Sequence, residues 1–140
     1  MLLSTILTCS LLAAPQEFSI QQSTKTVDKI ASFGGVELQV NQDQFETVPL
    51  GATIVIRKFP LGVDRTVDLR LERFEVFTEN AQIVVGSSGK DGSITNQQIE
   101  RPDLVLFRGH IDRDPDAHVF LAFGEHTTNG FIDSQGSRYI

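Results

Sequence analysis

The sequence predicts an all-β domain, an antiparallel sandwich or open barrel of short strands that follows a cleavable leader. Three observations support this class. From Phe33 onward, apolar and polar residues alternate over short runs, as in half-buried strands. Turn-forming Gly, Pro, Asn and Asp separate these runs at short intervals. After the leader, no long stretch carries the 3.6-residue period of an amphipathic helix.

Residues 1–14, MLLSTILTCSLLAA, are uncharged and mostly apolar, and a polar stretch begins after Pro15. This pattern is typical of the apolar region of a secretory signal peptide and is too short for a membrane span. We therefore expect cleavage near Ala14 and a secreted or cell-envelope location. Two alternatives stay open. Cys9 lies in a partial lipoprotein box, and the segment would equally suit a buried amino-terminal strand or helix of a cytosolic protein.

Composition and charge exclude several functional classes. The 140 residues, 40% of them hydrophobic, are enough for one core. Twelve Lys and Arg against 18 Asp and Glu give a net charge of -6, with no basic block, so no nucleic-acid partner is expected. The only cysteine is Cys9. A mature chain that begins after Ala14 would therefore have no disulfide, no thiolate zinc site and no cysteine nucleophile.

The leader is followed by a polar segment and then by the first expected strands. Residues 15–32 are rich in Gln, Ser and Thr, which predicts a polar connector with room for one short helical turn. The β-rich domain is expected to span residues 33–140. Its first strand is the alternating run Val36–Val40, and a turn at Pro49–Gly51 leads into the β-branched run Ala52–Phe59.

The clearest strand is Arg65–Phe77, with apolar residues on one face and charged residues on the other. The apolar face comprises Val67, Leu69 and Leu71. Phe74 and Val76 break this phase, which predicts a β-bulge or a bend at Arg73–Phe74. Beyond it we expect a strand at Ala81–Gly86 and a hairpin tip or loop at Ser87–Gly92. Four short runs complete the domain: Leu104–Phe107, Val119–Phe123, Gly130–Ile132 and Tyr139–Ile140.

The densest group of possible metal ligands lies in the segment Gly109–His118, GHIDRDPDAH. Its candidates are His110, Asp112, Asp114, Asp116 and His118. The three aspartates have the spacing that opens a calcium loop, but Ala117 and Phe123 occupy the positions where that loop needs Gly and an acidic residue. Neighbouring side chains of a hairpin point to opposite faces. We therefore expect an acidic hairpin tip and no metal site.

Two further segments offer weaker signals. Glu125-His126 beside two threonines has no nucleophile elbow, and Ser87–Lys90 lacks the full phosphate-loop pattern. Both are interpreted as loops. No catalytic, cofactor-binding or metal-binding residue is therefore expected in this chain.

From Val67 onward, three segments carry a family resemblance: Val67–Phe77, Leu106–Phe123 and Gly130–Ile140. Their order resembles the amino-terminal prodomain of secreted reprolysin- and adamalysin-type zinc metallopeptidases, especially bacterial relatives. The hairpin pattern of that family is matched at Phe107, Gly109, Asp114, Pro115, Val119 and Leu121, with Ala117 where a small hydroxyl residue is common. Its closing pattern is matched at Gly130, Ile132, Gly136, Tyr139 and Ile140.

The resemblance implies a non-catalytic, propeptide-like region that assists the folding or latency of a catalytic domain in cis. That zinc-binding domain, with H-E-x-x-H-x-x-G-x-x-H, would follow the present residues. The motif is absent from this chain, so the chain itself is not expected to be an enzyme. Many such prodomains place a cysteine on the zinc, and a mature chain without cysteine would instead have to cover the cleft. The alternative is an exported β-sandwich module for binding or adhesion at the cell surface.

Overall fold

The computed structural model describes residues 14–22, 36–124 and 127–140, and it confirms the all-β class. The leader lies almost wholly outside these residues, as do residues 23–32 of the expected connector and Glu125-His126. The strands are β1 (Gln16–Ser19), β2 (Gln21–Gln22), β3 (Leu38–Gln39), β4 (Thr53–Pro60), β5 (Thr66–Phe74), β6 (Ile83–Ser88), β7 (Ile94–Ile99), β8 (Leu104–Ile111), β9 (Asp114–Gly124), β10 (Thr127–Ser134) and β11 (Ser137–Tyr139), with a short helix α2 (Asp43–Glu46).

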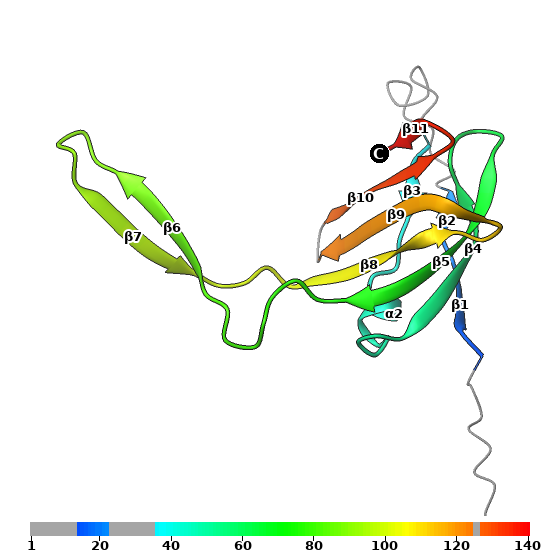
Figure 1. The fold of residues 1–140 in the computed structure, drawn as a ribbon, viewed down its shortest axis with the longest axis horizontal. Helices are drawn as coiled ribbons and strands as arrows, with labels where there is room; N and C mark the ends of the chain where they lie inside the picture. Colours follow the sequence, from blue (N-terminus) through cyan, green and yellow to red (C-terminus); the bar gives the residue numbers. More distant parts are fainter. Residues whose placement is uncertain (1–13, 23–35, 125–126) are drawn as a thin grey trace, which may run out of the picture.

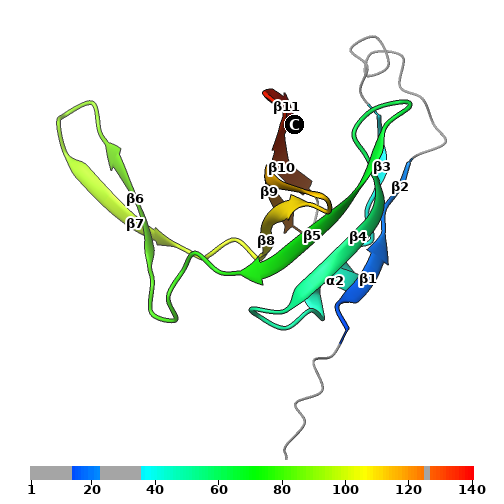
Figure 2. The same ribbon diagram turned by 45° about the vertical axis from the view of Figure 1, so that its right-hand side comes forward.

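Seven of these strands form one sheet in the order β1-β4-β5-β8-β9-β10-β11 (Figure 1). The neighbours are antiparallel, as expected, except that β1 runs parallel to β4. Two smaller pairs, β2-β3 and β6-β7, complete the described architecture. The main sheet curls strongly, so that β10 and β11 turn back toward the side of β2 and β3 (Figure 2). It has the form of an open barrel.

The core forms on the inner face of this curl, around the helix α2. Phe45 of α2 is fully buried, and its ring stacks on Phe123 of β9 with 4.4 Å between centroids. Phe18 of β1 and Phe107 of β8 lie 5.1 and 5.8 Å from the same ring. Strands that are distant in the sheet order therefore meet at one side chain. The sequence did not indicate α2, because four residues are too short to show a helical period.

Two glycines permit the close approach of neighbouring strands in the curled sheet. A Cβ at Gly109 would lie 2.0 Å from the carbonyl oxygen of Arg70, and one at Gly130 would lie 2.3 Å from that of Phe120. Real side chains do not reach such distances from a carbonyl oxygen, so any other residue would push the strands apart. Glycine inside a strand often marks a bend of this kind.

Of the bulge or bend expected at Arg73–Phe74, the bulge is wrong, whereas β5 does end at Phe74, short of the expected Phe77, and the chain then leaves the main sheet for the β6-β7 pair. β5 pairs with β8 without interruption from Leu69 to Phe74, and the irregularity lies in β4 instead, between Ile56 and Phe59. Phe74 does not slip in phase: it belongs to the outer face of the sheet, where its ring packs edge-on against Phe120 at 6.2 Å. The alternation therefore continues, and what changes is that the outer face becomes apolar near the end of β5.

The polar connector expected at residues 15–32 also needs correction where the structure describes it. Residues 16–19 form β1, and Gln21–Gln22 form β2. Phe18 packs against the core and Ile20 is buried. Strand β1 is an edge strand with one inward-facing ring, so its sequence remains polar overall. The folded part of the chain therefore begins before Phe33.

The hairpin β6-β7 projects from the main sheet as a separate arm, seen at the left of Figure 1. The expected strand at Ala81–Gly86 and the tip at Ser87–Gly92 are confirmed in outline, whereas β7 was not expected. Its sequence, ITNQQI, is too polar to show alternation. Within the tip, the carboxylate of Asp91 accepts hydrogen bonds from the backbone N–H and hydroxyl of Ser93, which hold the pKa of Asp91 below its usual range.

The close approach of β5 and β8 at Gly109 can be tested by substitution. Gly109→Ala should lower the free energy of unfolding by about 2 kcal/mol or more, because the new methyl group cannot be accommodated without moving β5 away from β8. Gly86→Ala in the arm is the matched control, since its Cβ would lie 3.4 Å from a flexible Asn96 side chain and the change should be nearly neutral. Urea denaturation measures both. Equal stability of the two variants would contradict this role of Gly109.

Candidate functional site

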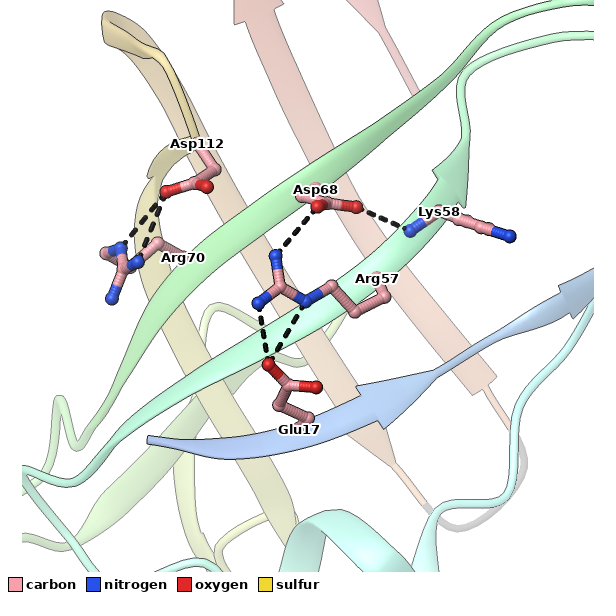
Figure 3. Close-up of polar contacts among 6 residues, drawn as sticks. All are labelled: Glu17, Arg57, Lys58, Asp68, Arg70 and Asp112. Carbon is pink, nitrogen blue, oxygen red and sulfur yellow. Dashed lines mark hydrogen bonds and ion pairs between the residues drawn. The ribbon is translucent and has the colours of Figure 1, made fainter. Parts of the chain in front are cut away.

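The segment Gly109–His118 forms the turn between β8 and β9, as the expected hairpin requires. Ile111 pairs with Asp114, and Arg113 takes the left-handed conformation with φ 74° at the tip. The carboxylate of Asp112 accepts hydrogen bonds from Arg70 at 3.2 and 3.3 Å (Figure 3). Asp114 accepts one from the Ser134 hydroxyl at 2.9 Å, and not from its own turn.

The two histidines of this segment lie beside Arg70, the residue that donates to Asp112. His110 and His118 line a shallow outer hollow of about 490 Å³, together with Arg70, Arg108 and Phe131. Asp116 is exposed. Among the described residues, no group of three His, Cys, Asp or Glu side chains lies close enough to hold a metal ion. The expectation that this chain binds no metal remains a prediction.

A chain of polar contacts crosses the outer face of the sheet from β1 to β5 (Figure 3). Arg57 donates to Glu17 at 2.6 Å and to Asp68 at 2.8 Å. The other oxygen of Asp68 accepts the backbone N–H of Lys58 at 2.8 Å. Lys58 has φ 51° and lies in the β4 irregularity, so Asp68 satisfies an N–H that has left the strand ladder.

These contacts shift the ionisation of the groups involved. The hydrogen bond from the Lys58 backbone, followed by that from Arg57, holds the pKa of Asp68 below its usual range. The hydrogen bonds to Glu17 and Asp68 raise the pKa of Arg57. Both groups therefore stay charged at neutral pH. Their role is to tie β1, β4 and β5 together at the bulge.

Aromatic rings and guanidinium groups form a second row on the outer face, which we call the outer ladder (Arg108, Phe74, Phe120, Phe131 and Arg138). Arg108 lies over Phe74 at 5.1 Å, and Arg138 lies over Phe131 at 4.8 Å. Phe120 packs between the two other rings, at 6.2 and 5.8 Å. All three rings are half-buried. Sequence reasoning missed this ladder, although alternation along β5, β9 and β10 places each of these phenylalanines on the outer face.

A cleft of about 1040 Å³ lies on the inner side of the curl. One wall comes from the segment before α2, with Val36, Leu38 and Val40, and the other from β10 and β11, with Ile132 and Tyr139. Phe59, Leu61 and Leu121 also line it. The charged residues among its described lining are Asp43 and Glu46, both acidic. The lining also includes polar side chains such as Asn41, Gln42 and Thr128, so the cleft is an open-sided surface of mixed polarity that is suited to binding.

Comparisons with models of protein families, with curated proteins and with solved structures found no match to this chain. No helix in the part of the chain that the structure describes has the length and apolarity to span a membrane. The arm (Figure 1), the cleft and the outer ladder are the surfaces of the described residues that could contact another molecule.

The contacts of Asp68 predict a specific pH dependence. The pKa of Asp68 is lower in the folded state than in the unfolded chain, where it is about 3.9. The ionised carboxylate therefore stabilises the fold above that pH. This contribution is lost as the pH falls through the pKa of Asp68 in the folded state. Asp68→Asn should therefore destabilise the protein by about 1 kcal/mol at pH 7, a figure reduced for partial solvent exposure. The difference from the original protein should shrink on acidification.

Asp64→Asn is the control, because Asp64 is exposed in the β4–β5 loop. Urea unfolding at pH 7 and at pH 3 measures the effect. A deficit of Asp68→Asn that is unchanged between the two pH values would show that the carboxylate charge has no role in holding the bulge.

Proposed function

We propose that this chain is a non-catalytic binding module that holds a folded partner domain. We further propose that the partner is the catalytic domain of a secreted zinc metallopeptidase, as the family resemblance implies. The observation that carries the first statement is the arm β6-β7. The second rests on the matches at Phe107–Leu121 and Gly130–Ile140.

The arm has the composition and exposure of a contact surface. Its strands, IVVGSS and ITNQQI, contain no charged residue. Val84 is 55% exposed and Ile94 is 76% exposed, on the same face of the hairpin. Surfaces of soluble proteins are normally rich in charge, whereas the centres of interfaces are depleted in it. A two-stranded hairpin alone is also only marginally stable in water, so a partner that covers it would stabilise it.

The base of the arm is held by side-chain contacts, whereas its two strands pair with no other described strand. Arg101 donates hydrogen bonds to the backbone carbonyls of Ala81 and Glu79, and its guanidinium lies over the ring of Phe77 at 6.0 Å. Among the described residues, β6 and β7 pair with each other alone. An arm with a fixed root and uncharged strands is suited to reach around a neighbouring domain.

For a metallopeptidase partner, the mechanism of latency would be steric. A mature chain beginning near Ala14 offers no thiolate for the zinc, since Cys9 would be removed with the leader. The module would then exclude substrate by lying over the catalytic cleft, with the arm extending the covered area. Cleavage between module and enzyme would release the activity.

The second candidate, an exported adhesion module, is favoured by the outer ladder. Its half-buried rings of Phe120 and Phe131 form an aromatic surface on the face opposite the core. The chain has no Trp and one Tyr, the rings that sugar-binding platforms use most, so such a module would contact protein rather than carbohydrate.

The first experiment reads the coding sequence downstream of the Ile140 codon. The proposal predicts an in-frame zinc-protease domain with H-E-x-x-H, and a catalytic domain whose peptide hydrolysis is inhibited when this chain is added in trans. A downstream frame without that motif would contradict the metallopeptidase assignment. Uninhibited hydrolysis by a correctly folded catalytic domain would contradict the proposed latency.

The second experiment tests the arm with the double variant Val84→Ser/Ile94→Ser. Loss of two exposed apolar anchors from one face should weaken inhibition of the catalytic domain at least tenfold, because each buried anchor contributes about 1–2 kcal/mol. Leu50→Ser is the matched control, since Leu50 is 59% exposed but lies at the turn before β4. Equal inhibition by both variants would exclude the arm from the interface.

A further inference from the structure

We propose that the cleft beside β11 is a strand-acceptor site. Its ligand is an extended protein segment with alternating apolar side chains and Lys or Arg at its amino-terminal end. This segment adds to the edge of β11 that no other described strand occupies, on a surface separate from the arm.

Among the described strands, β11 pairs with β10 alone, which leaves its other edge open at a defined residue. The turn before it, Gln135-Gly136, has φ 52° and 77°, as in a type I′ hairpin. Ser134 pairs with Ser137, and Ile132 pairs with Tyr139. Hydrogen-bonded pairs alternate with non-bonded pairs in an antiparallel ladder. In a two-residue hairpin of this register, the N–H and C=O of Arg138 therefore point away from β10, toward any strand that is added.

The walls of the cleft suit an extended chain better than a compact small molecule. Val36, Leu38 and Val40 recur at every second residue, which is the spacing of one face of a strand. Leu38, Val40 and Tyr139 are only partly buried against the core, so their remaining surface is open to a ligand. The volume of about 1040 Å³ lies at the upper end of small-molecule pockets, about 300–1,000 Å³, and the cleft is open-sided.

The charge of the cleft selects a basic ligand and sets its direction. Among the described lining residues, the charged side chains are Asp43 and Glu46 of α2. Phe45 of that helix stacks on Phe123, beside the start of β10. Because Tyr139 pairs with Ile132, β11 runs toward that same end of β10. A segment antiparallel to β11 would therefore begin near the two carboxylates, which places its basic residues at its amino-terminal end.

The test uses two fluorescein-labelled peptides on the full chain. The probes are Lys-Lys-Val-Thr-Val-Thr-Val-Thr and the same peptide with Glu-Glu at its start. We expect one-to-one binding of the Lys peptide at micromolar concentration, and binding of the Glu peptide at least tenfold weaker. Absence of binding by either peptide, or equal affinity for both, would overturn the proposal.

Arg138→Pro removes the outward N–H of β11 while keeping the bonds to β10, a position where edge strands tolerate proline. Arg138→Val is the matched control, because it loses the same side chain but keeps the N–H. Arg138→Pro should weaken binding of the Lys peptide at least tenfold, and Arg138→Val less than threefold. Equal affinity of the two variants would overturn strand addition.

Hydrogen exchange on the unmodified protein gives a second readout in case Arg138→Pro fails to fold. Exchange of the Arg138 amide should slow at least tenfold when the Lys peptide is bound. The Arg138 amide could instead be protected already in the free chain, with the chain forming dimers in solution that the Lys peptide does not dissociate. That result would identify a second copy of the chain as the occupant and overturn the proposal. Neither result depends on a protease, and Val84 and Ile94 lie outside the cleft, so this proposal and the proposed function fail separately.

Discussion

The structure depends on bending one sheet tightly enough for its strands to enclose a single phenylalanine. Phe45 comes from the helix α2, and its ring packs against Phe18, Phe107 and Phe123, which come from three described strands. A sheet with ordinary twist would not bring β1 and β9 to the same side chain. Glycine in β8 and in β10 permits the close approach of neighbouring strands, and β4 carries a bulge, a feature that increases local twist. Asp68 and Arg57 stabilise that bulge from the outside.

The same curl separates three surfaces that could each contact another molecule. Inside it, β11 ends beside the open cleft without joining a further described strand. On the outside, strand alternation places Phe74, Phe120 and Phe131 on one face, where Arg108 lies over Phe74 and Arg138 lies over Phe131. The arm leaves the sheet between β5 and β8, where it does not disturb their pairing. A module that only needed to fold would have little use for an arm with uncharged, exposed strands and for an open cleft, so binding is the role that this arrangement favours.

Sequence reasoning succeeded where alternation was long and failed where structure depended on a distant partner. β4 and β5 were predictable because their inward residues are consistently apolar. β1 was not, since one inward Phe18 among polar neighbours gives no period, and its pairing with β4 comes from outside the segment. The bulge predicted at Phe74 was wrong, because Phe74 keeps the alternation and belongs to an outer face that becomes apolar there. The bulge in β4 could not be placed from its own residues, because the carboxylate that satisfies Lys58 lies on β5. The cleft is formed by residues nearly one hundred positions apart, which no local pattern can indicate.

The most direct test of the account is the set of nuclear Overhauser contacts of the Phe45 ring in the purified protein. The curled sheet predicts contacts from this ring to Phe18, Phe107 and Phe123, whose centroids lie 5.1, 5.8 and 4.4 Å away. Contacts to Phe107 without contacts to Phe18 and Phe123, while the strand ladders remain intact, would show a flatter sheet. Such a result would contradict the enclosed core and, with it, the cleft beside β11.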